Sequence, residues 1–410
     1  MKKLPLLFLL VFMFNACSED NVGPSKDTEQ ALRDLRKVST EFTENSNEFT
    51  FDIFQTVNAS ADVDENIMIS PLSINLALGM LLNGTNGNSA EEIKEVLGWD
   101  DSDIAQINEN YKNILLSLPQ LDNVVDVSMA NSVWYDENFI VKDNFITTLD
   151  AEFDAEATAY DFTKSDAPDV INRWVEDKTN GLIDKILDNI KPGEVMFLIN
   201  ALYFKGEWTN KFDKDDTQQV PFTDINGEEY EVDMMMLRDK GLLVSVQEDY
   251  TVFDLPYGDE IYAMSILLPN DDVNLNTILE DLDAEDWYNF TSLKSNTSTT
   301  VGLPKFEFGY GLKLNDVLQE LGIEDVFDES VADLSNISDS QLFVNEVKHK
   351  AYIKVDEEGT EAAAVTSVGI VETSAPLSLE LICDKPFAFF IYEKEQGNIL
   401  FSGKIVALKE

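Results

Sequence analysis

The sequence predicts an α+β fold built on large antiparallel sheets. Segments rich in β-branched and aromatic residues are mixed with amphipathic helical segments, without the regular alternation of a doubly wound domain. The chain has 410 residues, 44% of them hydrophobic, so it can bury a large core. No internal repeat, proline-rich linker or low-complexity tract interrupts residues 40–410, and we therefore expect one large domain.

The clearest predicted helix begins at Ser70. Ser70 supplies an N-cap, Pro71 fits the first turn, and the residues up to Leu82 are apolar on nearly every side before the chain reaches Gly84. Such a helix belongs in a core. Ser89-Ala90-Glu91-Glu92 has the form of a capping box that opens another helix. Further helices are predicted at 48–57, 101–118, 167–179 and 314–321.

Strand character dominates the longest remaining apolar segments, which are 124–135, 195–204, 250–268, 299–308, 343–355 and 387–406. The shorter run Leu379-Glu380-Leu381-Ile382-Cys383 is also strand-like, so we expect Cys383 to be a buried, inert thiol. The only other cysteine is Cys17. An exported form of this chain would therefore carry no internal disulfide.

The N-terminus has the pattern of an export signal. A basic start, Met1-Lys2-Lys3, precedes an apolar run at 4–14 that is too short to span a bilayer comfortably. Phe14-Asn15-Ala16-Cys17 is similar to a bacterial lipobox, although Phe14 and Asn15 depart from its usual residues. We expect a signal peptide at 1–17 with a lipid on Cys17, a polar tether and lead-in at 18–40, and a location in the cell envelope or at the cell surface. Ordinary signal cleavage would give a secreted protein instead.

Charge and histidine content exclude several classes of function. The net charge of −49 repels nucleic acid and anionic membranes, so membrane contact is expected only through the lipid. The only histidine, His349, lies in the middle of a predicted strand, and no nucleophile-elbow pattern accompanies it, which argues against a Ser/His/Asp hydrolase. No set of histidine, cysteine and carboxylate residues has metal-binding spacing. We expect neither catalysis, nor a cofactor, nor a metal.

The segment from Glu357 to Ser374 is a loop that is able to become a strand. With a period of two, one face is uncharged and can be buried between strands, whereas an unpaired carboxylate there would cost several kcal/mol. Gly359 gives the backbone freedom at the point where such a segment would swing. Taken alone, the segment is more typical of a small-residue surface loop, because loops rich in alanine and threonine are common. Its uncharged face is Thr360, Ala362, Ala364, Thr366, Val368 and Ile370.

Five blocks of sequence, in the correct order, resemble the serpins, a family of loop-inserting protease inhibitors. The resemblance covers essentially the whole mature chain and implies three β-sheets, about eight to nine helices, a single domain at 41–410, an exposed reactive loop at about 357–378, and a monomer. The blocks are Glu357-Glu358-Gly359-Thr360-Glu361-Ala362-Ala363-Ala364, which is similar to the family's hinge, and Ile69–Ile74, Leu198–Trp208, Leu303–Phe306 with Leu318–Phe327, and Asp384–Phe387 with Ile399–Ile405.

The resemblance also implies two clusters of site residues. The first is the shutter, a hydrogen-bonded cluster where the main sheet parts, formed by Ser70, Ser73, Asn200 and His349. The second is the breach at the top of that sheet, where the loop first enters, with Lys305 and Glu357 as an ion pair and Trp208 beside them. A buried polar network of the shutter type can hold a closed sheet and form again after it opens.

The implied activity is inhibition of a serine protease by a suicide-substrate mechanism. The protease would form an acyl-enzyme on the loop, which then inserts into the main sheet and traps it. The attacked carbonyl lies fourteen positions after the hinge glycine in the family, which is Thr373 here, followed by Ser374. Ile370, Val371 and Glu372 are nearby alternatives. No Lys or Arg occurs from Gly359 to Asp384, so elastase-like or subtilisin-like proteases are the expected targets.

Two other functions compete with inhibition. A non-inhibitory serpin acting as a chaperone, carrier or storage protein would usually carry charged, proline or bulky residues on the inserting face, which this chain lacks. A binding lipoprotein of unrelated fold would explain Cys17 and the acidity but not the five blocks. Some serpins are activated by sulfated polysaccharides that bind a basic helix. The corresponding stretch here, 108–118, contains only one basic residue, Lys112, so we do not expect activation by a polyanion.

Overall fold

The computed structural model describes residues 26–100, 102–360 and 378–409, and these residues form ten α-helices and fifteen β-strands. No helix in this part of the chain is both long and apolar enough to cross a membrane. The helices are α1 Lys26–Leu35, α2 Thr40–Ser60, α3 Pro71–Leu82, α4 Gly87–Val96, α5 Ile104–Ser117, α6 Asp143–Phe153, α7 Ala167–Lys178, α8 Leu275–Asp281, α9 Ala284–Leu293 and α10 Asn315–Leu321.

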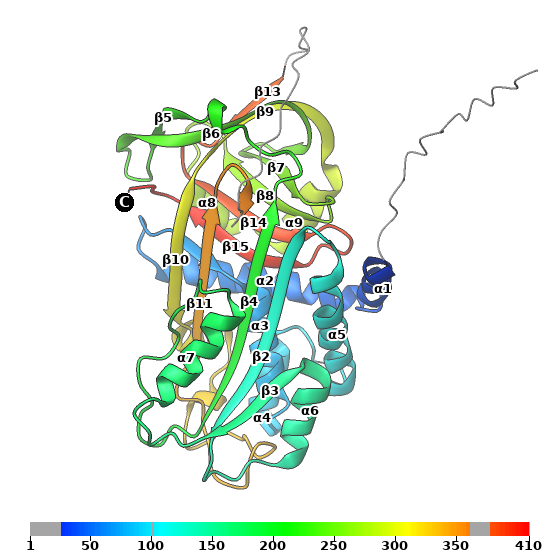
Figure 1. Cartoon of the computed structure of the whole chain (residues 1–410), viewed down its shortest axis with the longest axis vertical. Coiled ribbons are helices and arrows are strands. Elements are labelled where there is room, and N and C mark those ends of the chain that lie inside the picture. Colours follow the sequence, from blue (N-terminus) through cyan, green and yellow to red (C-terminus); the bar gives the residue numbers. More distant parts are fainter. Residues whose placement is uncertain (1–25, 101, 361–377, 410) are drawn as a thin grey trace, which may run out of the picture.

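The strands form two hydrogen-bonded sheets (Figure 1). They are β1 Ile67–Ile69, β2 Val125–Asp136, β3 Ala155–Tyr160, β4 Met196–Glu207, β5 Gln218–Thr223, β6 Glu229–Val246, β7 Tyr250–Tyr257, β8 Tyr262–Pro269, β9 Ser295–Pro304, β10 Phe306–Lys313, β11 Lys348–Val355, β12 Gly359–Thr360, β13 Leu379–Ile382, β14 Phe387–Glu393 and β15 Ile399–Ile405.

The six-stranded sheet, called the main sheet below, has the order β10-β11-β12-β4-β2-β3. All its neighbours are antiparallel except β2 and β3, which are parallel. Among the described residues, β11 and β4 are joined only through the two-residue strand β12. Below β12, no strand of the described residues lies between β11 and β4.

The nine-stranded sheet has the order β1-β15-β14-β8-β7-β6-β9-β13, with β5 added to β6. The structure has two hydrogen-bonded sheets where three were expected. The 18-residue strand β6 shifts register between Leu237 and Lys240 and pairs with β5, β7 and β9, so it links what would otherwise be two sheets into one. The mixture of helices with mainly antiparallel sheets confirms the α+β class.

Helix α3 lies in the core, as its sequence predicts. The Ser70 side chain accepts a hydrogen bond from the Ser73 N–H, Pro71 occupies the first turn, and eleven of the twelve helical residues are buried. The helix contacts β4 of one sheet and β15 of the other. It therefore connects the two sheets through the core.

Helix α1 begins in the segment expected to be a polar lead-in. Its apolar face is not exposed, because Ala31, Leu35 and the following Val38 are buried in the main core. The helix packs against α5, as Figure 1 also shows. With α1, the described part of the chain has ten helices where about eight to nine were expected.

Two local predictions were wrong, and a third segment, whose strand character was predicted correctly, divides into two strands. Helix α4 begins at Gly87, and Ser89 is not its cap: its buried hydroxyl accepts from the Asp333 N–H at 3.1 Å. The predicted strand 250–268 is a hairpin, β7 and β8, turning at 258–261. The predicted strand 343–355 starts only at Lys348, because residues 343–347 line a cavity instead of joining a sheet ladder.

Candidate functional site

The hinge enters the main sheet at β12. Gly359 pairs with Glu207 and Thr360 with Gly206 on β4, while Thr360 also pairs with Val355 on β11. The Thr360 side chain is buried at 4% exposure, and its hydroxyl lies 2.7 Å from that of Tyr257. The first residue of the uncharged face thus already occupies an inserted position.

Gly359 is required at this point by the close approach of β4. A Cβ atom at position 359 would lie 2.0 Å from the Gly206 carbonyl oxygen, and the backbone has a φ of +157°. Any side chain would have to push β12 away from β4. The glycine therefore allows β12 to pair with β4, on one side of the slot between β4 and β11.

Glu357 makes the ion pair that the breach requires. Lys305 Nζ lies 2.7 Å from Glu357 Oε1, and the Thr217 hydroxyl donates to the same oxygen at 2.7 Å. Burial opposes ionisation of Glu357, but the hydrogen bonds from Lys305 and Thr217 outweigh it and lower the pKa. The carboxylate is therefore held ionised at the top of the sheet.

Trp208 fixes the backbone that leads into the hinge. Its indole N–H donates to the Asp356 carbonyl at 3.0 Å, and its backbone N–H donates to the Glu358 carbonyl at 2.9 Å. The indole ring also stacks on Tyr257, with ring centroids 4.4 Å apart. One side chain thus connects the approach to the hinge with the tyrosine that holds Thr360.

Glu358 has partners that the sequence reasoning missed. Lys211 and Lys214 lie 3.1 and 3.0 Å from its two carboxylate oxygens. Burial alone would raise the pKa of Glu358, but the two lysines more than offset it and lower the pKa. The signal was the basic pair directly after the Trp208 block, in an otherwise acidic chain.

The shutter residues meet at the N-terminus of α3. The Ser70 N–H donates to His349 Nε2 at 3.0 Å, and the Ser70 hydroxyl donates to the Leu400 carbonyl at 2.8 Å. Burial lowers the pKa of His349 to about 4, so the ring is neutral at pH 7. His349 on β11 is in this way attached to the helix beneath the sheet.

The β4 side of the shutter is attached separately. The Ser73 hydroxyl donates to Asn200 Oδ1, and Asn200 Nδ2 donates to Asn131 Oδ1 at 2.7 Å. Asn131 on β2 was missed, because only its register opposite Asn200 places it there. No hydrogen bond joins His349 directly to Asn200 in the described structure. The two sides of the gap are linked through Ser70 and Ser73, at 3.3 Å.

A cavity of about 410 Å³ lies below this point between α3, β4 and the chain leading into β11. Its apolar walls include Leu78 and Leu81 of α3 and Leu198 of β4, with Val344 and Val347 opposite. Strands β4 and β11 border it without pairing with each other. The described residues thus leave the slot between β4 and β11 partly unfilled.

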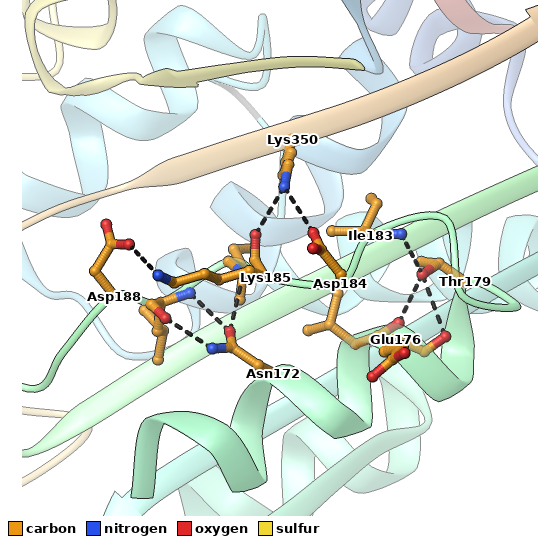
Figure 2. Close-up of polar contacts among 11 residues, drawn as sticks. Asn172, Glu176, Thr179, Ile183, Asp184, Lys185, Asp188 and Lys350 are labelled. Atoms are coloured by element: carbon orange, nitrogen blue, oxygen red, sulfur yellow. Dashed lines mark hydrogen bonds and ion pairs between the residues drawn. The ribbon is translucent and has the colours of Figure 1, made fainter. Parts of the chain in front are cut away.

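The segment after α7 crosses in front of the slot (Figure 2). Asn172 of α7 holds it by accepting from the Ile186 and Leu187 N–H groups at 2.9 and 2.8 Å. Lys350 of β11 reaches it from the other side, 3.3 Å from Asp184 Oδ1 and 3.0 Å from the Lys185 carbonyl. A strand that entered between β4 and β11 would have to pass beneath this segment.

Comparison with known proteins agrees with this architecture. The profile of the family described as Serpin (serine protease inhibitor) matches residues 44–408. This chain belongs to the serpin family. Serpin B11 of Mus musculus is 33% identical over 383 residues, which cover 88% of this chain and 98% of the mouse protein. Leukocyte elastase inhibitor of Xenopus laevis is 32% identical over 368 residues, covering 87% and 96%.

Solved serpin structures superpose closely on the chain. The thermophilic serpin tengpin in its native state gives a TM-score of 0.84 at 32% identity, covering 90% of this chain and 95% of tengpin. Human thyroxine-binding globulin complexed with thyroxine gives 0.82 at 26% identity, covering 91% and 100%. The serpin fold is therefore shown over nearly the whole described chain.

Several residues that the lipobox and the serpin resemblance singled out lie outside the described residues. They are Cys17, the hinge residues Glu361, Ala362, Ala363 and Ala364, and the reactive-bond candidates Ile370, Val371, Glu372, Thr373 and Ser374. Cys383 is described: it is a free thiol, fully buried, and burial raises its pKa. Within the described ranges no cluster of three or more potential metal ligands occurs.

Proposed function

We propose that this serpin inhibits serine proteases as a suicide substrate. The observation that carries the proposal is the position of Thr360, buried between β4 and β11 at the mouth of a slot where those strands have no other common partner among the described residues. The residues after Thr360 continue an alternating sequence with one uncharged face. A loop freed by cleavage would extend β12 downward and supply the missing strand.

Insertion would release enough free energy to drive such a change. About a dozen residues would gain ladder hydrogen bonds on both sides, each worth about 1 kcal/mol net, so the total is on the order of 10 kcal/mol or more. The intact protein is then a kinetically trapped form. The acyl-enzyme would be carried along the main sheet and distorted before water completes hydrolysis, so the inhibitor is consumed in the reaction.

The reactive bond in this proposal is Thr373-Ser374. A threonine preceded by Val371 and Ile370 suits the modest apolar pockets of elastase-like or subtilisin-like proteases. The Xenopus laevis relative carries the name leukocyte elastase inhibitor, which supports the elastase-like class. We also propose that the protein is exported as a monomer and anchored in the cell envelope by a lipid on Cys17.

The test is to incubate the protein with pancreatic elastase and with subtilisin and to analyse the products by denaturing gel electrophoresis and mass spectrometry. We expect an adduct stable to denaturant and a released peptide that begins at Ser374. Cleavage without an adduct would contradict inhibition. It would favour the alternative, a non-inhibitory carrier or binding serpin, which the similarity to thyroxine-binding globulin also makes worth testing.

The thermal stability of the cleaved protein is a second test. We expect the form nicked near residue 373 to unfold at a distinctly higher temperature than the intact form, because the inserted loop completes the main sheet. Nicking at an exposed site away from the loop serves as the control, and it should lower the unfolding temperature or leave it unchanged. If loop cleavage gives no increase, the stored free energy that the proposal needs is absent.

A further inference from the structure

A second pocket, of about 400 Å³, lies where the C-terminal half of α2 meets α8, α10 and the end of β15. None of its lining residues belongs to the hinge, the breach or the shutter. Three sets of polar groups face it: Lys404 of β15 with Asn276 of α8, Asn58 of α2, and the carboxylates Glu280 and Glu320. Two of these sets, the buried Lys404 ammonium group and the buried Asn58 side-chain oxygen, are incompletely satisfied by the described chain, which points to a ligand.

Lys404 is an almost fully buried lysine, 1% exposed, on β15, the second strand of the nine-stranded sheet, where it pairs with Ile67 and Ala388. Its ammonium group makes one hydrogen bond within the described structure, a long one of 3.3 Å to Asn276 Oδ1, and it pairs with no carboxylate there. An ammonium group has three donors. Burial lowers the pKa of Lys404, opposed by the charge of Glu65.

Another buried lysine shows what a satisfied site looks like in this fold. Lys294 lies 2.7 Å from Asp254 Oδ1 and 3.0 Å from the Ser265 hydroxyl, and it sits over three aromatic rings, including that of Trp287. Within residues 26–100, 102–360 and 378–409, Lys404 has no comparable set of partners. Because an unpaired buried charge is costly, the difference indicates that Lys404 is kept for an external anion.

The same pocket also contains a hydrogen-bond acceptor without a donor among the described residues. Asn58 Oδ1 is buried and accepts no hydrogen bond from the part of the chain that the structure describes. Gln55 does not serve it, since the Gln55 amide donates to the Leu282 carbonyl at 2.7 Å. A ligand that fits the pocket should therefore offer an N–H or O–H donor as well as an anionic acceptor.

The carboxylates at the rim decide the charge of the ligand. Glu280 and Glu320 are exposed at the pocket and form no ion pair within the described residues. They would repel a simple anion approaching Lys404, and the net charge of −49 would add to that repulsion. A zwitterion avoids this, because its cationic end faces the two glutamates. Ala59, Ala61 and Val63 add apolar wall for a side chain.

We propose that this pocket binds a free amino acid or a short peptide. The ligand's carboxylate would be held by Lys404 and the Asn276 amide. Its ammonium group would face Glu280 and Glu320 and donate to Asn58 Oδ1. The volume of about 400 Å³ suits a ligand the size of a dipeptide.

The test is isothermal titration calorimetry on the full mature chain with its loop intact, using L-leucyl-L-leucine as the probe. We expect saturable binding of one dipeptide per chain. N-acetyl-leucyl-leucine, which lacks the ammonium group, and leucyl-leucinamide, which lacks the carboxylate, should each bind at least about tenfold more weakly. No saturable binding of the dipeptide up to about 10 mM, or equal binding of the three compounds, would overturn the proposal.

Two sets of variants locate the binding. Lys404→Met should weaken leucyl-leucine binding at least about tenfold, while the matched variant Lys313→Met, at an exposed lysine of β10, should leave it unchanged. The double variant Glu280→Gln and Glu320→Gln should weaken leucyl-leucine and leucyl-leucinamide but not the acetylated dipeptide. It alters only exposed side chains, so it decides the question even if Lys404→Met does not fold. Wild-type affinity in the double variant would contradict the proposed orientation.

Discussion

Thr360 offers the sharpest test of loop insertion, and we predict that Thr360→Arg converts this serpin from an inhibitor into a substrate. In the structure the threonine side chain is 4% exposed, between β4 and β11, with its hydroxyl 2.7 Å from that of Tyr257. Within the described residues, no carboxylate forms a hydrogen bond with the Thr360 side chain. An arginine could neither stay in this position nor find a partner for its charge there.

The size of the effect follows from the cost of burying an unpaired charge. That cost is about 3–5 kcal/mol, and every 1.36 kcal/mol corresponds to a factor of ten in rate. If insertion must pass through a state with residue 360 buried, it should slow by about 10²–10⁴-fold. Hydrolysis of the acyl-enzyme would then finish first.

The assay compares wild type, Thr360→Arg and the control Thr360→Ser, which keeps the hydroxyl near Tyr257. We expect the stable adduct with elastase to disappear for the arginine variant and to persist for the serine variant. Both should be cut at the same bond. Wild-type yields of adduct from Thr360→Arg would refute the reasoning that the Thr360 position must be filled for inhibition.

Three further predictions concern stability and reactivity. Lys305→Met should lower the free energy of unfolding in urea by about 1–3 kcal/mol, because buried Glu357 loses its nearest cation; an unchanged midpoint would contradict this. His349 binds a proton more weakly in the folded state than in the unfolded state. Its contribution to the free energy of unfolding should therefore be fully present above about pH 6.5, and that free energy should fall by up to about 3 kcal/mol towards pH 4. His349→Gln should lose less over that range, whereas parallel pH profiles would disprove the assignment. Cys383 should react with iodoacetamide only after unfolding, and rapid labelling of the native protein would show that its burial is wrong.

Local patterns predicted the elements whose signals are short-range. The cap at Ser70, the proline after it and the apolar residues that follow identified α3 closely, since each acts within one or two helical turns. The same reasoning failed at Ser89, where a capping-box pattern exists but the hydroxyl accepts from Asp333, far away in the sequence. A cap and a tertiary contact use the same side-chain oxygen, and only packing chooses between them.

The site shows the same division. The resemblance named Lys305 with Glu357, and the structure places them 2.7 Å apart. It did not provide Lys211 and Lys214 as partners of Glu358, nor Asn131 as a partner of Asn200, because these contacts depend on how turns and strands are brought together across the fold. No sequence spacing encodes such distances.

The sequence by itself determined the chemistry available to this protein: an uncharged alternating loop, a single histidine outside any catalytic pattern, and a strongly acidic surface. Tertiary structure alone decided that Thr360 enters a slot between β4 and β11, that His349 is neutral, and that Lys404 is buried with no carboxylate partner among the described residues. The physical reason is that composition and periodicity depend on neighbours along the chain. Burial and pairing depend on which distant segments fill the space around a side chain.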